Sequence, residues 1–289
     1  MELRDHTHHH PHGPHQGGDS AAMAELLDLD AAVLHSYLSD VTSWIQRQAT
    51  DVPLRRILDL GAGTGTGTIA LARRFGAAEV IAVDRAEELL TRVRAKAADL
   101  NIADRVRTVR ADLDAAWPAV EPVDLVWASN SLHEMADPDR VFKDAFAAIR
   151  PGGLLAVAEM DALPRFLPED IGLGRPGLES RCHEALEQER GDTQPRLGPD
   201  WGPHLERSGF TILGERTFTI DLTPPQPPAT GHYAHAYLRR IRPVLEGRMA
   251  TDDLAALDTL LDSDGPDGVL HRHDLVVRGT RTAWVARRP

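Results

Sequence analysis

The sequence predicts a doubly wound α/β fold with a mostly parallel sheet and a mainly helical cap. Two observations indicate the sheet: short apolar runs rich in Val, Ile and Leu have the length of strands, and segments of helical period separate them. The runs are residues 56–60, 80–83, 106–109, 125–128 and 154–158, and the helical segments are 69–75, 86–101 and 137–149. Continuous apolar strands that alternate with amphipathic helices are typical of a parallel sheet covered on both faces.

A third observation indicates the cap, because this rhythm breaks after residue 159. Pro and Gly become frequent over residues 162–198, and apolar residues recur at steps of three and four ahead of the first strand, over 19–48. Further elements are expected as helices at 178–189, 201–208 and 233–261, and as strands at 210–222 and 276–286. We therefore expect the cap to come from residues 20–50, 162–198 and 226–265.

Composition limits the functional classes. The chain of 289 residues has 44 acidic and 32 basic residues and a formal charge of −12, which opposes binding to a phosphate backbone, so no nucleic-acid partner is expected. A single cysteine, Cys182, excludes an intrachain disulfide and fits a reducing compartment. No apolar run is long enough to span a bilayer and no signal peptide is evident, so we expect a cytoplasmic protein without a membrane partner.

The first strand runs directly into a glycine-rich loop. Asp59, Gly61, Gly63 and Gly65 form an acidic-x-Gly-x-Gly-x-Gly pattern, with Ala62 between the first two glycines. A ligand laid across a strand-to-helix turn needs glycines there, because the turn requires unusual dihedrals and a Cβ would block close backbone approach. The following helix N-terminus adds unpaired N–H groups. The loop is therefore expected to bind a nucleotide-like ligand.

Acidic residues follow the next two predicted strands. Asp84 ends the second strand, with Arg85 after it, and a carboxylate there can accept both hydroxyls of a ribose. Asp112 follows the third strand beside the apolar Leu113, where the acid can accept from an adenine amino group and the leucine can cover the ring. These positions lie at the carboxyl ends of successive parallel strands, where open α/β sheets bind ligands.

With these residues in order, the sequence resembles the class I S-adenosylmethionine-dependent methyltransferases over about residues 50–160. The resemblance rests on residues 58–65, on Asp84 and Asp112, on 123–134 after the fourth strand, and on 150–153 before the fifth. It implies S-adenosylmethionine as the cofactor. It also implies a sheet of seven strands with the last antiparallel, the strands at 210–222 and 276–286 being the sixth and seventh.

Two other functions stay open at this point. Residues 65–70 also match the Gly-x-Gly-x-x-Gly/Ala dinucleotide fingerprint, so Asp84 could hold the ribose of NAD in a dehydrogenase. That fingerprint should begin at the strand end, and here it begins about four residues late. The other alternative is a binding protein that keeps the cofactor fold without transferring a methyl group.

Methyl transfer aligns a nucleophile with the methyl carbon and the sulfur, and it often needs a base. His133, in the loop after the fourth strand, is the first catalytic candidate, either as general base or by shape alone. Glu159, which ends the fifth strand, is the second, as a base, as an acceptor for a substrate hydroxyl, or as a structural carboxylate. Asn130 is expected to contact the amino acid end of the cofactor.

The predicted domain organisation follows the chain. Residues 1–19 form a disordered tail with six histidines, 20–50 an N-terminal helical cap, 51–162 the S-adenosylmethionine-binding core, and 163–289 the rest of the sheet with helical cap insertions. The large insertions favour a small-molecule acceptor in an enclosed pocket. No structural metal site is predicted, the state is a monomer or homodimer, and the acceptor and the methylated atom are open.

Overall fold

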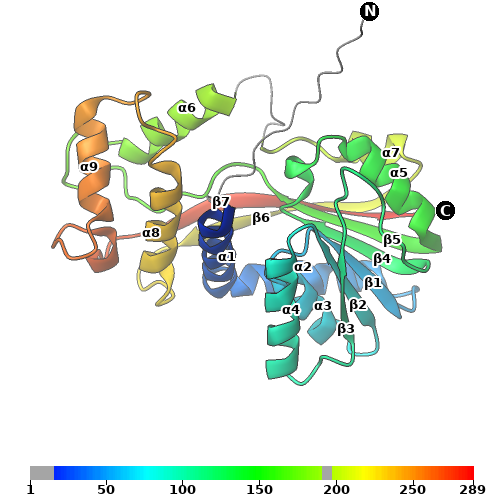
Figure 1. Cartoon of the computed structure of the whole chain (residues 1–289). Helices are drawn as coiled ribbons and strands as arrows, with labels where there is room; N and C mark the ends of the chain where they lie inside the picture. Colours follow the sequence, from blue (N-terminus) through cyan, green and yellow to red (C-terminus); the bar gives the residue numbers. More distant parts are fainter. Residues whose placement is uncertain (1–15, 191–196) are drawn as a thin grey trace, which may run out of the picture.

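The computed structural model describes residues 16–190 and 197–289, and within them the chain forms one twisted sheet with helices on both faces (Figure 1). The strands are β1 (Arg56–Leu60), β2 (Glu79–Asp84), β3 (Val106–Arg110), β4 (Val123–Ser129), β5 (Ile149–Met160), β6 (Thr211–Leu222) and β7 (Val277–Arg287). Their order is β3-β2-β1-β4-β5-β7-β6. The first five strands pair in parallel, and β7 lies antiparallel between β5 and β6. The predicted seven-stranded sheet with its last strand antiparallel is confirmed.

The apolar runs bury both faces of the central strands. In β1, Ile57 packs with one helical layer and the adjacent Leu58 with the opposite layer, and both are fully buried. One face is covered by α2 (His35–Gln48), α3 (Thr66–Arg74) and α4 (Glu87–Asp99), and the other by α5 (Pro138–Ala148) and α7 (Gly202–Arg207). Because both faces are buried, these strands carry no polar alternation.

The remaining helices gather beyond β6 and β7 (Figure 1). They are α1 (Gln16–Val33), α6 (Leu178–Arg190), α8 (Thr230–Ile241) and α9 (Thr251–Leu261), with a short 3₁₀ turn, η3 (Val269–His271). Ion pairs join α9 to α6 and the segment before it: the buried Asp253 on α9 accepts from Arg181 and Arg175 at 2.7–3.0 Å. These bonds hold the pKa of Asp253 below its usual range, so α6 and α9 are fastened together by a charged contact.

Two helical predictions are corrected. The pattern over 19–48 forms two helices, because the backbone turns at Leu34 (φ −101°, ψ 27°), where Val33 and Leu34 are both buried. The turn lets α1 contact α8 while α2 lies on the sheet. The pattern over 233–261 is likewise two helices, since Pro243 has no N–H to continue the hydrogen bonding of α8 and Gly247 takes a left-handed φ of +72°. Helix α1 begins at Gln16, and residues 1–15 of the predicted tail lie outside the described residues.

The Pro151-Gly152-Gly153 segment, expected from the sequence to precede the fifth strand, lies inside β5. The register passes from Val123 opposite Ile149 to Leu125 opposite Leu154, so the segment is accommodated as a bulge. Gly152 has a left-handed φ of +81° and donates its N–H to Arg288 on the neighbouring chain end at 2.8 Å. A residue with a Cβ would be strained there.

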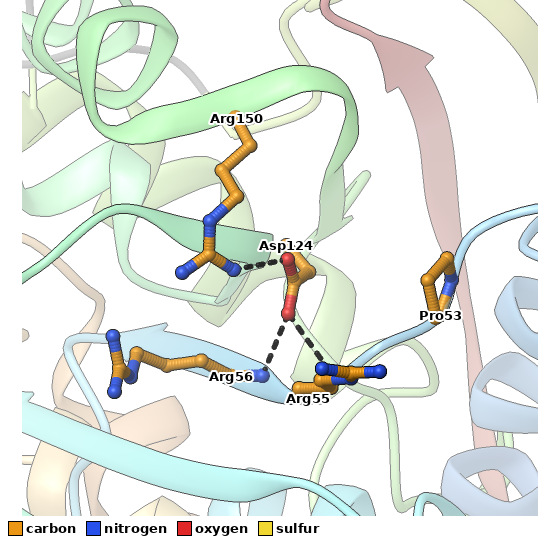
Figure 2. A pocket seen from close by; sticks show the side chains of 5 residues that line it. All are labelled: Pro53, Arg55, Arg56, Asp124 and Arg150. Carbon is orange, nitrogen blue, oxygen red and sulfur yellow. Dashed lines mark hydrogen bonds and ion pairs between the residues drawn. The ribbon is translucent and has the colours of Figure 1, made fainter.

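At the amino ends of the strands, one carboxylate joins three segments. Asp124 accepts the backbone N–H groups of Arg55 and Arg56 at 2.8 and 2.9 Å, and it pairs with the guanidinium of Arg150 (Figure 2). The same residues, with Pro53, line a cavity of about 380 Å³. This cavity lies at the opposite end of the sheet from the glycine loop, so we assign it to the scaffold.

Within the described ranges, no helix is long and apolar enough to cross a membrane. The same residues contain no group of three or more His, Cys, Asp or Glu side chains arranged to hold a metal ion.

Asp124→Ala is expected to lower the free energy of unfolding by about 2–4 kcal/mol, because two backbone donors and Arg150 lose a buried acceptor. Urea unfolding at pH 7 measures it. The matched control is Glu121→Ala, which removes an exposed partner of Arg56 2.6 Å away and should cost about 0–1 kcal/mol. Equal losses in the two variants would contradict a structural role for Asp124.

Candidate functional site

The glycine loop between β1 and α3 is built from left-handed backbone. Gly61, Gly63 and Gly65 have φ values of +66°, +54° and +85°, which side chains with a Cβ rarely adopt. Between them, Ala62 donates its N–H to Val83 of β2 at 2.9 Å, which fastens the loop to the neighbouring strand. The loop therefore folds back over the sheet edge before α3 begins.

Neighbouring side chains also require two of these glycines. A Cβ at Gly61 would lie 2.5 Å from the Cβ of Ser131, and one at Gly65 would lie 2.8 Å from Val93 on α4. Gly63 faces a different element, since its Cβ would lie 3.0 Å from the Leu27 side chain of α1. Helix α1 thus crosses over the predicted cofactor loop.

Asp84, at the end of β2, orients the loop from the side. Its carboxylate accepts from the N–H of Gly63 and from that of Ala86, each at 2.9 Å, and the side chain is almost fully buried. Each carboxylate oxygen has a second lone pair. Asp84 is therefore fixed in place and keeps acceptor capacity for a ligand hydroxyl.

Asp59 lies behind the loop rather than at its surface. The hydroxyl of Thr68 on α3 donates to its carboxylate at 2.5 Å, and burial raises the pKa of Asp59 to about 7, to which the nearby charge of Asp84 also contributes. Gly67 allows this packing, since a Cβ there would lie 3.3 Å from Asp59 Oδ2. The sequence analysis did not identify Thr68. The available signal was a hydroxyl side chain in the first turn of α3, next to the glycine loop.

The other predicted contacts stand at the ends of β2 and β3. Asp112 is exposed, and one of its carboxylate oxygens accepts the N–H of Asp114 at 3.0 Å in a tight turn, while the adjacent Leu113 is buried. Arg85 is exposed, and its carbonyl accepts from Arg110 at 3.2 Å. These residues lie on the same edge of the sheet as Asp84, as expected.

Asn130, after β4, combines an unusual backbone with an unsatisfied side chain. Its φ is +49°, and its N–H donates to Ala158 of β5 at 3.0 Å. Its side-chain oxygen is buried and has no hydrogen-bond partner among the described residues. A buried acceptor without a donor is costly, so this position suits a ligand that carries N–H or O–H groups.

The structure brings the two catalytic candidates together. Glu159, 2% exposed, accepts from the N–H groups of Ser131 and Leu132 at 2.8 and 3.0 Å through one oxygen, and its other oxygen lies 2.7 Å from Nδ1 of His133. The 3₁₀ turn η1 (Leu132–Glu134) holds the imidazole at this place. Glu159 therefore orients His133 and shapes the turn that carries it.

A buried polar cluster from the cap completes this side of the site, and Arg281 and Asp30 within it were not identified from the sequence. Arg281 of β7 pairs with Asp30 of α1 and stacks over the ring of Tyr37 on α2, 4.9 Å from its centroid. Burial raises the pKa of Tyr37 to about 12, so its hydroxyl is a donor at neutral pH. Tyr233 of α8 donates to the same carboxylate at 2.6 Å.

Known proteins share this architecture. A family profile described as a methyltransferase domain matches residues 57–153, the segment that contains the glycine loop, Asp84, Asp112 and His133. Trans-aconitate 2-methyltransferase of Variovorax paradoxus is 32% identical over 142 residues, 47% of this chain and 51% of that protein. Over residues 57–153, the chain therefore has the sequence of a methyltransferase domain.

Two further similarities support this assignment. Malonyl-[acyl-carrier protein] O-methyltransferase of Halorhodospira halophila is 32% identical over 209 residues, 71% of this chain and 65% of that protein. A Bacillus halodurans structure described as a methyltransferase is 18% identical, with a TM-score of 0.53 over 86% of this chain and 98% of that one, which shows the same fold. The chain thus spans between half and two thirds of the length of these curated relatives.

S-adenosylmethionine is the cofactor of this family, and the residues of this methyltransferase domain fit it. The buried oxygen of Asn130 is an acceptor that an ammonium could satisfy, and Asp84 keeps acceptor capacity beside the loop. The dehydrogenase register does not fit: β1 ends at Leu60, Gly65 is the residue that caps α3, and the rest of that fingerprint lies within the helix.

Asp59→Asn is expected to change how stability depends on pH. The folded pKa of about 7 lies above the unfolded value, so the stabilising contribution of protonated Asp59 is complete below about pH 4 and disappears as the pH rises through 7. Asparagine does not ionise and can still accept from Thr68. The variant should therefore gain stability over the native chain between pH 4 and 7, by at most about 1.4 kcal/mol per pH unit.

Urea unfolding at pH 5, 6, 7 and 8 measures this difference, with the exposed Asp104→Asn as the matched control. A difference between Asp59→Asn and the native chain that stays constant across these pH values would contradict the buried, protonated form.

Proposed function

We propose that this protein transfers the methyl group of S-adenosylmethionine to a small organic acceptor bound between the strand ends and the helical cap. The observation that carries the proposal is the pair formed by Glu159 and His133, at the ends of β5 and β4. The pair is continuous with the glycine loop, because Ser131, which Glu159 holds, donates its hydroxyl to Leu60 and abuts Gly61. A carboxylate-oriented imidazole beside a cofactor loop is an arrangement suited to proton removal.

Each predicted cofactor contact then has a role that its position supports. Asp84 accepts the ribose hydroxyls, Asp112 accepts from the adenine amino group with Leu113 against the ring, and Asn130 accepts from the ammonium end. Arg85 borders the same strand end. Asp59 acts from behind, since its bond to Thr68 positions the start of α3 and so the loop with its glycines.

The chemistry of His133 follows from its partner. An ionised carboxylate only accepts hydrogen bonds, so Nδ1 of the imidazole carries the hydrogen that points to Glu159 and the basic lone pair is on Nε2. The bound cofactor supplies an electrophilic methyl group on a positively charged sulfur. His133 holds the proton that the acceptor releases, and Glu159 stabilises the imidazolium that results.

The position of the cap is an argument for a small acceptor. Helix α1 crosses the glycine loop at Leu27 and reaches β7 through Asp30, so the space above the strand ends is covered. Covered sites exclude water and hold small molecules. The relatives are named for trans-aconitate and for malonyl-[acyl-carrier protein], and those names alone do not identify the acceptor of this chain. The oriented imidazole favours transfer over binding alone, because it supplies a base that transfer can use.

S-adenosylhomocysteine is expected to raise the melting temperature of the protein, since a ligand that binds the folded state stabilises it. Asp84→Ala should weaken its binding by about 1.5–3 kcal/mol, the value for a charged hydrogen-bond partner, measured by calorimetry. The control is Asp104→Ala, an exposed aspartate before β3, which should leave the affinity unchanged. No stabilisation by S-adenosylhomocysteine would refute the proposed function.

His133→Asn is expected to lower kcat by about 10²–10⁴-fold, the usual contribution of a general base, with the affinity for S-adenosylhomocysteine retained. The measurement is release of S-adenosylhomocysteine with any acceptor that the native enzyme methylates, as a function of pH. Loss of the base should also remove the rise of kcat with pH. A variant with native kcat and a native pH profile would show that His133 serves shape alone.

A further inference from the structure

The polar cluster beside the Glu159–His133 dyad contains a buried cation, Arg281, whose positive charge is already paired with a carboxylate. Arg281 is 5% exposed and pairs with the carboxylate of Asp30, which also accepts the hydroxyl of Tyr233 at 2.6 Å. The ring of Tyr37 covers the guanidinium, 4.9 Å from its centroid. Residues of α1, α2, α8 and β7 therefore enclose this guanidinium.

The pair stands next to the site of methyl transfer. In the register between β5 and β7, Thr282 lies opposite Glu159 and Arg281 opposite Met160, the next residue along β5. Asp30 lies one helical turn after Leu27, the residue whose side chain approaches Gly63 of the cofactor loop. The Asp30–Arg281 pair thus joins the two sides of the site, the loop and the dyad.

Two carboxylates lie beside the imidazole of His133. Glu159 is buried behind His133, and the carboxylate of Glu134 lies 3.6 Å from Nε2 of the imidazole. An anionic acceptor would meet these carboxylates, and to reach Arg281 it would have to displace Asp30 from a desolvated pair. Displacing Asp30 would leave its carboxylate without the cation that compensates its charge, which is strongly unfavourable.

The dyad gives a second, independent indication. A carboxylic acid has a pKa near 4 and is already ionised at neutral pH, so its methylation needs no base. A hydroxyl or an amine attacks with a proton that must leave. As a base, an imidazole oriented by a buried carboxylate has a function only for an acceptor of the second kind.

We infer that the acceptor of this enzyme is a hydroxyl or amine compound, whose reacting atom carries a proton, and that the Asp30–Arg281 pair excludes carboxylates. The inference rests on the proposed function and names its substrate class. In the step, the acceptor lone pair forms the bond to the methyl carbon while the carbon–sulfur bond breaks. Its electron pair returns to sulfur as S-adenosylhomocysteine forms, and the acceptor proton passes to Nε2 of His133.

The test compares matched acceptors, such as benzyl alcohol, benzylamine and benzoate, within a panel of aryl and alkyl sets. Calorimetry on the full chain saturated with S-adenosylhomocysteine measures binding, and release of S-adenosylhomocysteine from S-adenosylmethionine measures transfer. In the native protein the carboxylate of a set should bind at least tenfold more weakly than its alcohol or amine. Carboxylates that bind as tightly, or that are methylated faster, would overturn the inference.

Asp30→Asn tests the pair directly, because it leaves Arg281 with an unmatched charge. The variant should bind carboxylates at least tenfold more tightly than the native protein, and Asp30→Asn combined with Arg281→Gln should lose that gain. Asp28→Asn is the matched control: Asp28 lies on the same helix and pairs with Lys96 and Arg92 of α4, away from Arg281. Equal carboxylate affinity in Asp30→Asn and Asp28→Asn would overturn the inference.

The outcomes separate this inference from the function on which it rests. If S-adenosylhomocysteine does not stabilise the protein, the proposed function fails. If S-adenosylhomocysteine stabilises the protein but carboxylates are the preferred acceptors, only the inference about the acceptor fails. Should Asp30→Asn not fold, the ranking of acceptors by the native protein still decides.

Discussion

The carboxylate of Glu159 is the contact on which the site depends. From the end of β5 it accepts two backbone N–H groups of the turn after β4 and lies 2.7 Å from Nδ1 of His133. Ser131 of that turn then donates to Leu60 of β1 and occupies the space beside Gly61. One buried side chain therefore sets the geometry of three adjacent strand ends, and the glycine at position 61 is a consequence of the turn that Glu159 holds.

In the cap, ion pairs fix the position of neighbouring elements in the same way as the hydrogen bonds of Glu159. Helix α1 is tied to α4 through Asp28 and to β7 and α8 through Asp30, and Leu27, next to Asp28, approaches the glycine loop. Because these ion pairs join α1 to both α4 and β7, its position over the glycine loop is fixed. Two of the chain's acidic residues thus fix the place of α1, since Asp28 and Asp30 each pair with a basic side chain of another element.

The strand ends were predictable because the signal is local. Asp84 and Asp112 follow apolar runs whose length and composition indicate parallel strands, and parallel strands bring their carboxyl ends to one edge. The helical periodicity did not predict where a helix is interrupted. The turn at Leu34 depends on burying two consecutive side chains, Val33 and Leu34, in the tertiary core. The bulge at Pro151-Gly152-Gly153 depends on the register with β4, and a single segment encodes neither of these.

The sequence by itself determined the order of elements and the glycine loop, because these follow from residue type and spacing along the chain, and its resemblance to the methyltransferases implied the cofactor. Only the tertiary structure showed that Asp59 lies behind the loop on Thr68, that Glu159 orients His133, and that Asp30 neutralises Arg281 across 251 positions. Hydrogen bonds and ion pairs need atoms within about 3–4 Å of each other. Which residues come that close depends on how the sheet and the cap pack together.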